Sequence, residues 1–202
     1  MNGFGKQTER KRSAIIEVAG RKLAELSYNR ATMKEIAADA KVSQVTIYNY
    51  FGSKDELLIE AVRGMMDEQL EQYRRRLSEE ADYSKLVGGI MLEEARFVKR
   101  IIACVRQSAD SGFVHARLRE YQDVQLAPFL IELVKKGVRE GRIAEDLTEA
   151  ELLFYFGMYQ REMIRMLDGS DREERTGAAG AVSEERFIDF FFHGLLSPRF
   201  RV

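Results

Sequence analysis

The sequence predicts an all-α protein. Apolar side chains recur every three to four residues along nearly the whole chain, which is the spacing of one face of an α-helix. The 202 residues include only two prolines, and no segment shows the strict apolar-polar alternation of a half-buried strand. Three Ser/Thr-x-x-Glu pairs have the spacing of capping boxes, so they mark where individual helices begin.

Three helices are expected in the N-terminal quarter of the chain. An apolar stripe predicts a helix over residues 8–26, followed by a turn. Thr32 and Glu35 form the first capping box, in which each side chain satisfies an unpaired backbone N–H, and they begin a second helix that ends near residue 40. Ser43 is a good N-cap for a third short helix, which ends near residue 51 because Gly52 breaks it.

The remaining helices are predicted to be longer. The capping box of Ser53 with Glu56 begins a helix over residues 54–77. Further helices are expected over residues 84–109, 113–119, 121–140 (closed by Gly141), 148–167 (capped by Thr148 with Glu151) and 184–196, the last after a Gly- and Ala-rich loop over 169–183.

Charged residues are distributed unevenly along the chain. The first 54 residues contain ten Lys and Arg and five Asp and Glu, whereas the rest contains 22 and 28. A basic segment on an acidic body favours a polyanion as the partner of the basic part. We therefore predict two domains, residues 1–54 and residues 55–202.

The second and third expected helices form a helix-turn-helix, a motif whose second helix can enter the major groove of DNA. Ala37 would allow the helices to approach closely, and Ile47 would fill the space between them. The remaining surface of the third helix carries amide, hydroxyl and phenol groups but no carboxylate, which suits base edges and phosphate oxygens. These residues are Gln44, Val45, Thr46, Tyr48, Asn49 and Tyr50. For the two tyrosines, packing in the core is the alternative interpretation.

Residues 46–57, Thr-Ile-Tyr-Asn-Tyr-Phe-Gly-Ser-Lys-Asp-Glu-Leu, resemble the T-x-Y-x-Y-F-x-S-K-x-x-L signature of the TetR family. The resemblance extends over residues 10–60 and departs from the family at Lys41, where the turn usually has Gly. It implies a transcriptional regulator, usually a repressor, that binds a palindromic double-stranded DNA operator as a homodimer. It further implies a small-molecule effector that releases the protein from DNA.

The resemblance also implies roles for individual residues. Thr32, Tyr50 and Lys54 would contact phosphates, and Ser43 belongs to the same DNA-binding set. Gln44, Val45, Thr46 and Asn49 would face base edges, with Tyr48 between base and backbone. The basic side chains of Lys6, Arg10, Lys11 and Arg12 would add phosphate contacts, with a solvated run of charge as the alternative.

The last two helices are expected to form the dimer interface. The predicted terminal helix is apolar almost all round, so it must be covered on two sides. A four-helix bundle made by two chains would provide that cover, and a purely intramolecular core is the alternative.

The resemblance places an effector pocket in the larger domain. Candidate lining residues by helical phase are Met65, Tyr73, Glu94, Phe97, Ile101, Cys104, Phe113, Phe129, Tyr155, Tyr159, Gln160 and Met163. Apolar and aromatic side chains at such spacing also form ordinary core. Glu94 is expected to point inward, where its carboxylate needs a partner, either a cationic ligand or an internal arginine such as Arg96 or Arg161.

Other classes of protein are disfavoured. The chain has two histidines and one cysteine, Cys104, and no metal-ligand spacing, phosphate-binding glycine loop or catalytic triad, so we expect neither an enzyme nor a cofactor. No apolar run is long enough to span a membrane and no signal peptide is recognisable, so a cytoplasmic protein is expected. A protein-binding adaptor that has lost DNA binding is disfavoured because Thr46, Tyr48 and Lys54 are all present.

Overall fold

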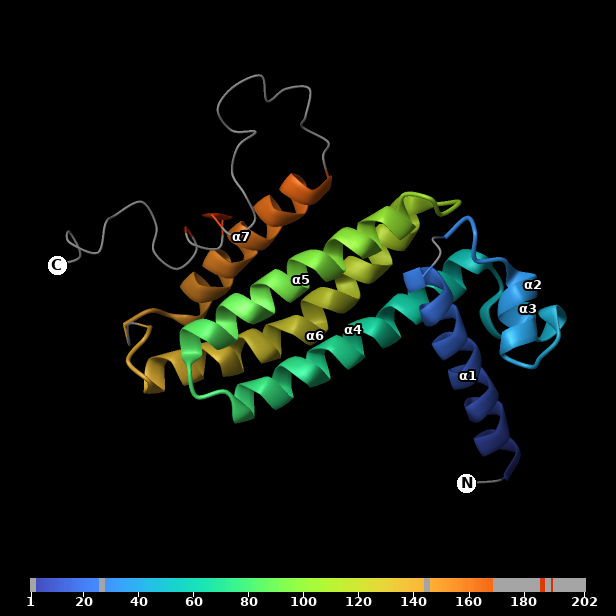
Figure 1. Ribbon diagram of the computed structural model, residues 1–202, viewed down its shortest axis with the longest axis horizontal. Coiled ribbons are helices and arrows are strands. Elements are labelled where there is room, and N and C mark those ends of the chain that lie inside the picture. The colour runs from blue at the N-terminus through green and yellow to red at the C-terminus, as the bar shows by residue number, and fades with distance from the viewer. Residues whose placement is uncertain (1–2, 26–27, 144–145, 169–185, 188–189, 191–202) are drawn as a thin grey trace, which may run out of the picture. The chain divides into compact units, whose positions relative to one another are not determined.

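The structure, a computed structural model, describes residues 3–25, 28–143, 146–168, 186–187 and 190. The described residues form helices and turns with no strand, which confirms the all-α prediction. The helices in chain order are α1 (Gly3–Glu25), α2 (Met33–Asp39), α3 (Gln44–Phe51), α4 (Lys54–Glu79), α5 (Tyr83–Val105), α6 (Ser111–Arg139) and α7 (Glu149–Asp168) (Figure 1).

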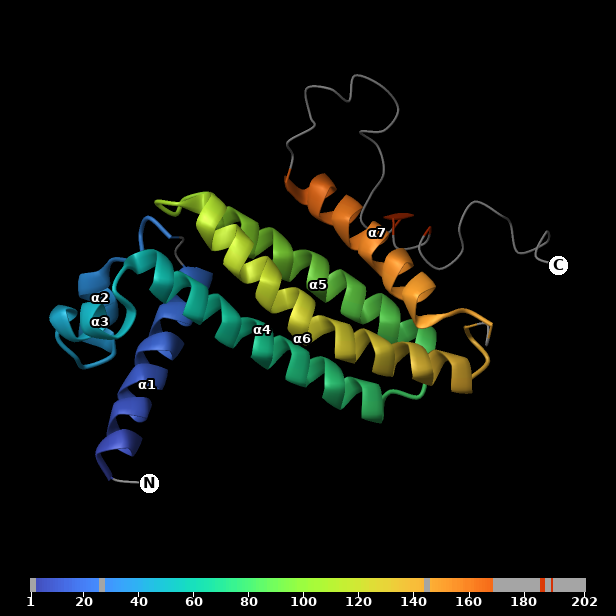
Figure 2. The same cartoon turned by 180° about the vertical axis from the view of Figure 1, so that it is seen from behind.

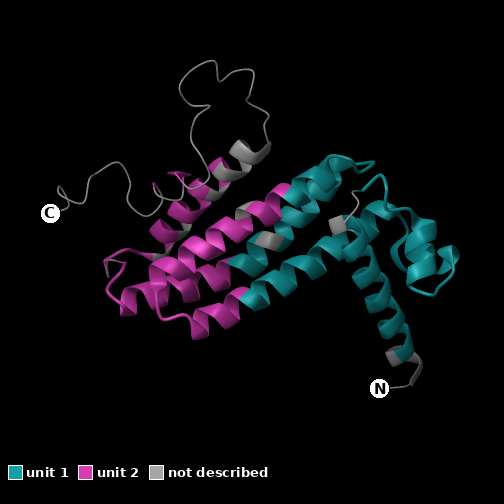
Figure 3. Ribbon diagram, in the orientation of Figure 1, with its two compact units in different colours: residues 1–72, 100–126 teal, residues 73–99, 127–202 magenta. Residues whose placement is uncertain are grey.

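The chain divides into two compact units (Figure 3). Unit 1 comprises residues 1–72 and 100–126, and unit 2 comprises residues 73–99 and 127–202. The three long helices α4, α5 and α6 therefore each contribute residues to both units. The division describes packing, and the expected functional boundary after residue 54 stays a prediction.

Unit 1 contains the helix-turn-helix. Helices α2 and α3 lie side by side at the start of α4, as views from opposite sides agree (Figures 1 and 2). Apolar side chains at helical spacing form its core because each helix buries one face. The buried residues include Ile15, Ala19 and Leu23 of α1, Ile36 and Ala37 of α2, Ile47 and Phe51 of α3, and Leu57, Leu58 and Ala61 of α4.

Local hydrogen bonds define the ends of α2 and α3. The Glu35 N–H donates to the Thr32 hydroxyl oxygen (3.2 Å), and the Thr32 N–H donates to the Glu35 carboxylate (3.1 Å), which confirms the capping box. The Thr46 N–H donates to the Ser43 hydroxyl oxygen (3.0 Å), so Ser43 is the N-cap of α3. Between the helices, Lys41 has φ 55°, a left-handed conformation that costs a non-glycine residue about 1–2 kcal/mol.

Two predicted boundaries in the middle of the chain were wrong. The expected helices over residues 113–119 and 121–140 are one helix, α6, because Glu120 between them is a helix former that lies exposed on its surface. Helix α5 ends at Val105 rather than at residue 109. The backbone N–H groups of Ala109 and Asp110 donate instead to the carboxylate of Asp55 (3.3 and 3.0 Å), which holds residues 106–110 in a turn.

The other ends differ less from the prediction. Helix α1 begins at Gly3, earlier than the expected residue 8. The N–H of Glu56 donates to the Ser53 hydroxyl oxygen (3.1 Å), and Gly141 follows α6 with φ 66°, as expected of a closing glycine. The predicted loop over residues 169–183 and most of the predicted helix over 184–196 lie outside the described residues.

Unit 2 packs the end of α4, most of α5, the second half of α6, and α7. The rings of Tyr73 and Phe129 lie 5.9 Å apart, and both side chains are fully buried. Gly137 of α6 allows a close approach, since a Cβ atom built there would lie 2.6 Å from the ring and hydroxyl of Tyr83. Within the described residues, no helix is both long and apolar enough to cross a membrane.

We expect Gly137→Ala to destabilise the protein by about 1–3 kcal/mol, because the methyl group would displace the buried Tyr83 ring. Urea-induced unfolding followed by circular dichroism measures the change in free energy. Gly112→Ala is the control: the position is exposed in the first turn of α6, and its nearest neighbour lies 3.6 Å from a built Cβ atom. That variant should keep its stability or gain up to about 1 kcal/mol. Equal losses in both variants would contradict the steric explanation.

Candidate nucleic-acid interface

The two faces of α3 differ sharply in exposure. Ile47 is fully buried, whereas Val45 on the other side is 67% exposed and Tyr48 is 46% exposed. Gln44 and Asn49 are also exposed, and Thr46 and Tyr50 are partly exposed. The predicted base-reading residues therefore share one accessible surface, which has two amides, a methyl-bearing side chain and a phenol but no carboxylate.

Hydroxyl groups at the edges of this surface also serve the helix caps. The Thr32 hydroxyl donates to the Glu35 carboxylate (2.7 Å), and these hydrogen bonds lower the pKa of Glu35. The Ser43 and Thr46 hydroxyl oxygens lie 2.8 Å apart. Each of these hydroxyls already makes a hydrogen bond within the motif. Each still has a lone pair that can accept a further hydrogen bond. Ser43 thus has a structural role beyond the predicted contact with DNA.

Lys54, a predicted phosphate contact, has an internal partner. Its ammonium donates to the backbone carbonyl of Tyr28 and lies 4.0 Å from the centroid of the Tyr28 ring. The side chain is partly buried, and this burial lowers the pKa of the Lys54 amine. To reach a phosphate, Lys54 must leave this position or share its protons between the two acceptors.

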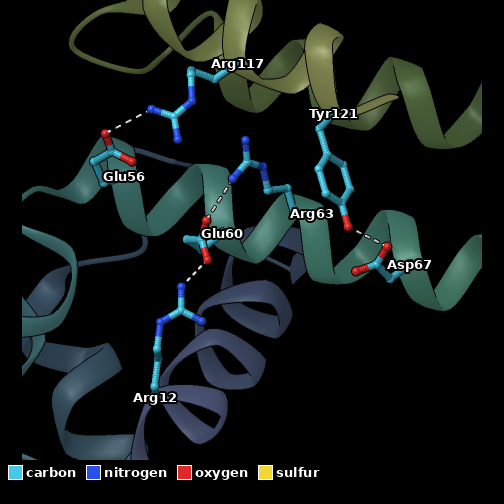
Figure 4. Close-up of polar contacts among 7 residues, drawn as sticks. All are labelled: Arg12, Glu56, Glu60, Arg63, Asp67, Arg117 and Tyr121. Atoms are coloured by element: carbon cyan, nitrogen blue, oxygen red, sulfur yellow. Dashed lines mark hydrogen bonds and ion pairs between the residues drawn. The ribbon is translucent and has the colours of Figure 1, made fainter. Parts of the chain in front are cut away.

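Arg12 differs in surroundings from the rest of the predicted basic arm. Its guanidinium pairs with Glu60 of α4 (Figure 4). The same group lies 5.5 Å from the centroid of the Phe51 ring. Arg10 and Lys11 are exposed, and the side chain of Lys6 lies outside the described part of the chain. Arg12 thus holds α1 against α4, whereas Arg10 and Lys11 are exposed to solvent.

Asp55 was not singled out from the sequence, although its charged side chain is buried. Its carboxylate accepts the Tyr28 hydroxyl (2.5 Å) and the backbone N–H groups of Ala109 and Asp110. Burial, followed by the hydrogen bond to Asp55, raises the pKa of Tyr28. One carboxylate in the first turn of α4 therefore connects the segment before α2 with the turn that joins α5 to α6.

Ion pairs continue this connection along α4. Arg117 of α6 lies 3.6 Å from Glu56, and the Tyr121 hydroxyl donates to Asp67 (2.6 Å) (Figure 4). Arg63 donates to Glu60 (3.1 Å), and its guanidinium lies 4.9 Å from the centroid of the Tyr121 ring. Burial and the Asp67 contact raise the pKa of Tyr121 to about 12, so its hydroxyl stays a donor at neutral pH. In unit 1, the first half of α6 is thereby attached to α4.

The predicted effector-pocket residues fall into two separate units. Met65, Ile101 and Cys104 belong to unit 1, where the Cys104 thiol donates to the Leu23 carbonyl (3.7 Å). Phe113, also in unit 1, is exposed. The remaining candidates belong to unit 2, and the side chains of Gln160 and Met163 lie outside the described part.

In unit 2 the structure brings Tyr73, Glu94 and Phe129 together. The Tyr73 hydroxyl donates to the Glu94 carboxylate (3.2 Å), and burial raises the pKa of Glu94 despite that bond. The expected arginine partners, Arg96 and Arg161, are both exposed. The partner that sequence analysis did not foresee is thus a phenol from α4.

Other aromatic candidates of unit 2 gather along α7. Tyr155 and Tyr159 have ring centroids 4.9 Å apart, and Tyr159 lies 5.2 Å from Phe187. The Tyr159 hydroxyl donates to the Phe190 carbonyl (3.0 Å). Phe97 of α5 is buried. The side chains of Tyr155, Tyr159 and Phe187, in contrast, stay partly exposed.

A hollow of about 350 Å³ lies elsewhere in unit 2, between α6 and α7. Its lining residues are Leu130, Ile131, Val134, Lys135, Val138, Arg139, Leu147, Leu152 and Phe156. None of the predicted pocket residues is among them. In the described part of the chain, no three His, Cys, Asp or Glu residues are grouped as metal ligands.

Comparison with known proteins agrees with the geometry of the helix-turn-helix. Residues 15–61, which contain α2, α3 and the start of α4, match the family described as "Bacterial regulatory proteins, tetR family". The chain is 23% identical over 164 residues to the HTH-type transcriptional repressor KstR2 of Mycobacterium tuberculosis, covering 77% of this chain and 80% of that protein. Residues 15–61 therefore have the DNA-binding motif of the TetR family.

Two solved structures of bacterial regulators have a similar fold. The fatty acid degradation regulator FadR from Bacillus halodurans has a TM-score of 0.61 at 20% identity, covering 92% of this chain and 96% of that chain. FadR from Bacillus subtilis in complex with stearoyl-CoA has a TM-score of 0.61 at 18% identity, with 91% and 99% covered. This similarity shows that the fold of these two proteins extends over the helix-turn-helix and the larger helical part of this chain.

Replacement of Asp55 tests its role in holding unit 1 together. We expect Asp55→Ala to destabilise the protein by about 1–3 kcal/mol or more, because it leaves buried donors without an acceptor. Tyr28→Phe should cost less, since it removes a single bond. In urea unfolding, the double variant should be more stable than the sum of the two losses predicts, with a coupling energy of about 0.5–3 kcal/mol. Strict additivity would show that the two side chains do not interact.

Proposed function

We propose that this protein is a ligand-responsive transcriptional repressor that binds a palindromic DNA operator as a homodimer and is released by a small-molecule effector. The observation that carries the proposal is the exposed face of α3, where Val45 and Tyr48 face solvent opposite the buried Ile47. An apolar side chain as exposed as Val45, among amides and phenols, suits contact with the edges of base pairs.

The chemistry of this surface suggests how bases are read. The amides of Gln44 and Asn49 can each donate and accept, so either can form two hydrogen bonds with adenine in the major groove. Val45 can contact the methyl group of thymine. Tyr50 and the cap residue Thr32 flank these positions and would reach phosphate oxygens, as would Lys54 after it exchanges the Tyr28 carbonyl for a phosphate.

Dimer formation is proposed through α7 and the segment that follows it. Phe154 is 66% exposed and Met158, one turn later, is 41% exposed, so α7 presents an apolar stripe that a second chain can cover. Two-fold symmetry would then place two recognition helices about 34 Å apart, one turn of B-DNA. A palindromic operator follows from that symmetry.

The effector is proposed to act through α4 and α6. Both helices pass from unit 2 into unit 1, and in unit 1 Asp55 and the Arg117–Glu56 pair attach the start of α6 to the first turn of α4. An effector that binds one arrangement of these helices more tightly would shift the population toward it and change the position of α3. The similar FadR of Bacillus subtilis, solved with stearoyl-CoA, supports a small-molecule effector.

Selection of sites from a random double-stranded DNA library tests the proposal directly. We expect a palindromic motif whose half-sites are about one helical turn apart, at an ionic strength of about 0.15 M. Recovery of only weak, sequence-independent binding would contradict the operator proposal and favour a protein-binding adaptor.

Variants of the selected complex separate the roles of individual residues. Gln44→Ala should relax specificity at one base pair and cost about 1–3 kcal/mol there, whereas Lys54→Ala should weaken binding to all sequences and reduce the salt dependence by about one ion. Binding is measured by fluorescence anisotropy with matched and mismatched operators at several salt concentrations. Arg142→Ala, which removes an exposed cation of unit 2, is the control and should change neither property. Equal losses across all sequences in the first two variants would refute the assigned roles.

A further inference from the structure

The hollow between α6 and α7 has the composition of a ligand site. Seven of its nine lining residues are apolar, contributed by the second half of α6, by α7 and by Leu147 just before α7. Its volume of about 350 Å³ is near the lower end of the range of small-molecule sites, roughly 300–1,000 Å³. The hollow therefore suits a compact apolar body.

Two cations, Lys135 and Arg139, complete the lining. They lie one helical turn apart on α6 and are both exposed, so both charged groups can contact the same carboxylate of a ligand. No ion pair of either is found among the described residues. Their neighbour Lys136 is different, because it donates to the carbonyls of Leu77 (3.0 Å) and Glu80 and pairs with Glu140 (3.7 Å).

None of the acidic side chains described near the hollow belongs to its lining. The carboxylate of Glu151, in the first turn of α7, accepts the N–H and hydroxyl of Thr148 (2.8 and 2.7 Å). Glu140 is paired with Lys136, and Glu132 is exposed on α6 outside the lining. The two charged residues that line the otherwise apolar hollow are thus both cations.

We propose that this hollow binds a small organic anion with an apolar body, such as a medium-chain fatty acid. The chain or ring would pack against Val134, Val138 and Phe156, and the carboxylate would bind Lys135 and Arg139, whose guanidinium can hold both oxygens at once. Identification of this anion as the effector rests on the proposed function, but its binding does not.

The location of the site connects the ligand with the DNA-binding unit through one continuous helix. Lys135 and Arg139 lie in the second half of α6, and the first half carries Arg117 and Tyr121, which contact α4 in unit 1 (Figure 4). A ligand that changes the position of α6 would therefore act on the same helix that holds α4.

Calorimetric titration of the full-length protein with octanoate, octanol and octylamine tests the proposal. These probes share one apolar body and differ in the charge of the head group. Octanoate should bind about 2- to 30-fold more tightly than octanol, the gain expected from two exposed ion pairs, and octylamine should bind most weakly. Equal affinities for the three probes, or binding of none of them, would overturn the proposal.

Charge variants test whether Lys135 and Arg139 are responsible. The double variant Lys135→Ala with Arg139→Ala should reduce octanoate affinity to that for octanol and leave octanol unaffected. The matched control, Arg96→Ala with Lys99→Ala, removes two exposed cations from α5 in the same unit and should leave both affinities unchanged. If both double variants lowered octanoate affinity equally, the change in the net charge of the protein would explain the loss. That result would overturn the proposed contacts.

Two lining variants test the location. Val138→Phe should fill part of the hollow and lower octanoate and octanol binding together by at least tenfold. Leu147→Asp, at a position 44% exposed and therefore tolerant of charge, should weaken octanoate more than octanol and favour octylamine over both. Circular dichroism verifies that each variant is folded. Unchanged octanoate binding in the folded Leu147→Asp variant would place the ligand elsewhere.

Binding to the selected operator separates this inference from the proposed function. All variants should bind operator normally without a probe. If octanoate binds as described but does not release the operator, the site is supported and its role as effector site fails. If the operator is bound and no probe binds, the inference fails while the DNA-binding proposal is retained.

Discussion

The buried carboxylate of Asp55 sets a constraint on the whole of unit 1. Its two oxygens accept hydrogen bonds from a phenol and from two backbone N–H groups, so a charge that would otherwise be costly to bury is satisfied. The donors come from the segment before α2 and from the turn after α5, which are far apart in sequence. Replacing any of these groups would leave unsatisfied partners, so the first turn of α4 and both segments must move together.

Local signals in the sequence were sufficient to predict the helix-turn-helix. Cap residues such as Thr32 and Ser43 act on backbone groups three positions away, and the burial of Ile47 follows from helical phase. The exposed surface of α3 could therefore be predicted residue by residue. The same reasoning misplaced the break in α6, where no local breaker exists between the two expected helices.

Non-local partners could not be read from the sequence. The position of Asp55 in the first turn of a helix suggests only an interaction with the helix dipole, whereas its bonds depend on chain packing across some fifty positions. Arg12 looks like part of a basic arm until Glu60 of α4 is placed beside it. The hollow between α6 and α7 likewise depends on how two helix surfaces fit together, which helical phase does not reveal. Tyr73 and Phe129, for example, have the phase expected of pocket residues but pack against each other in the core.

Pro128 gives α6 an unusual mechanical property. It lies two residues beyond Leu126, where the helix leaves unit 1, and it has no N–H to donate to the carbonyl of Val124. A helix that lacks one rung of its hydrogen-bond ladder bends there more readily than elsewhere. Pro128 is therefore the position at which α6 can bend most readily, close to where the helix passes from one unit to the other.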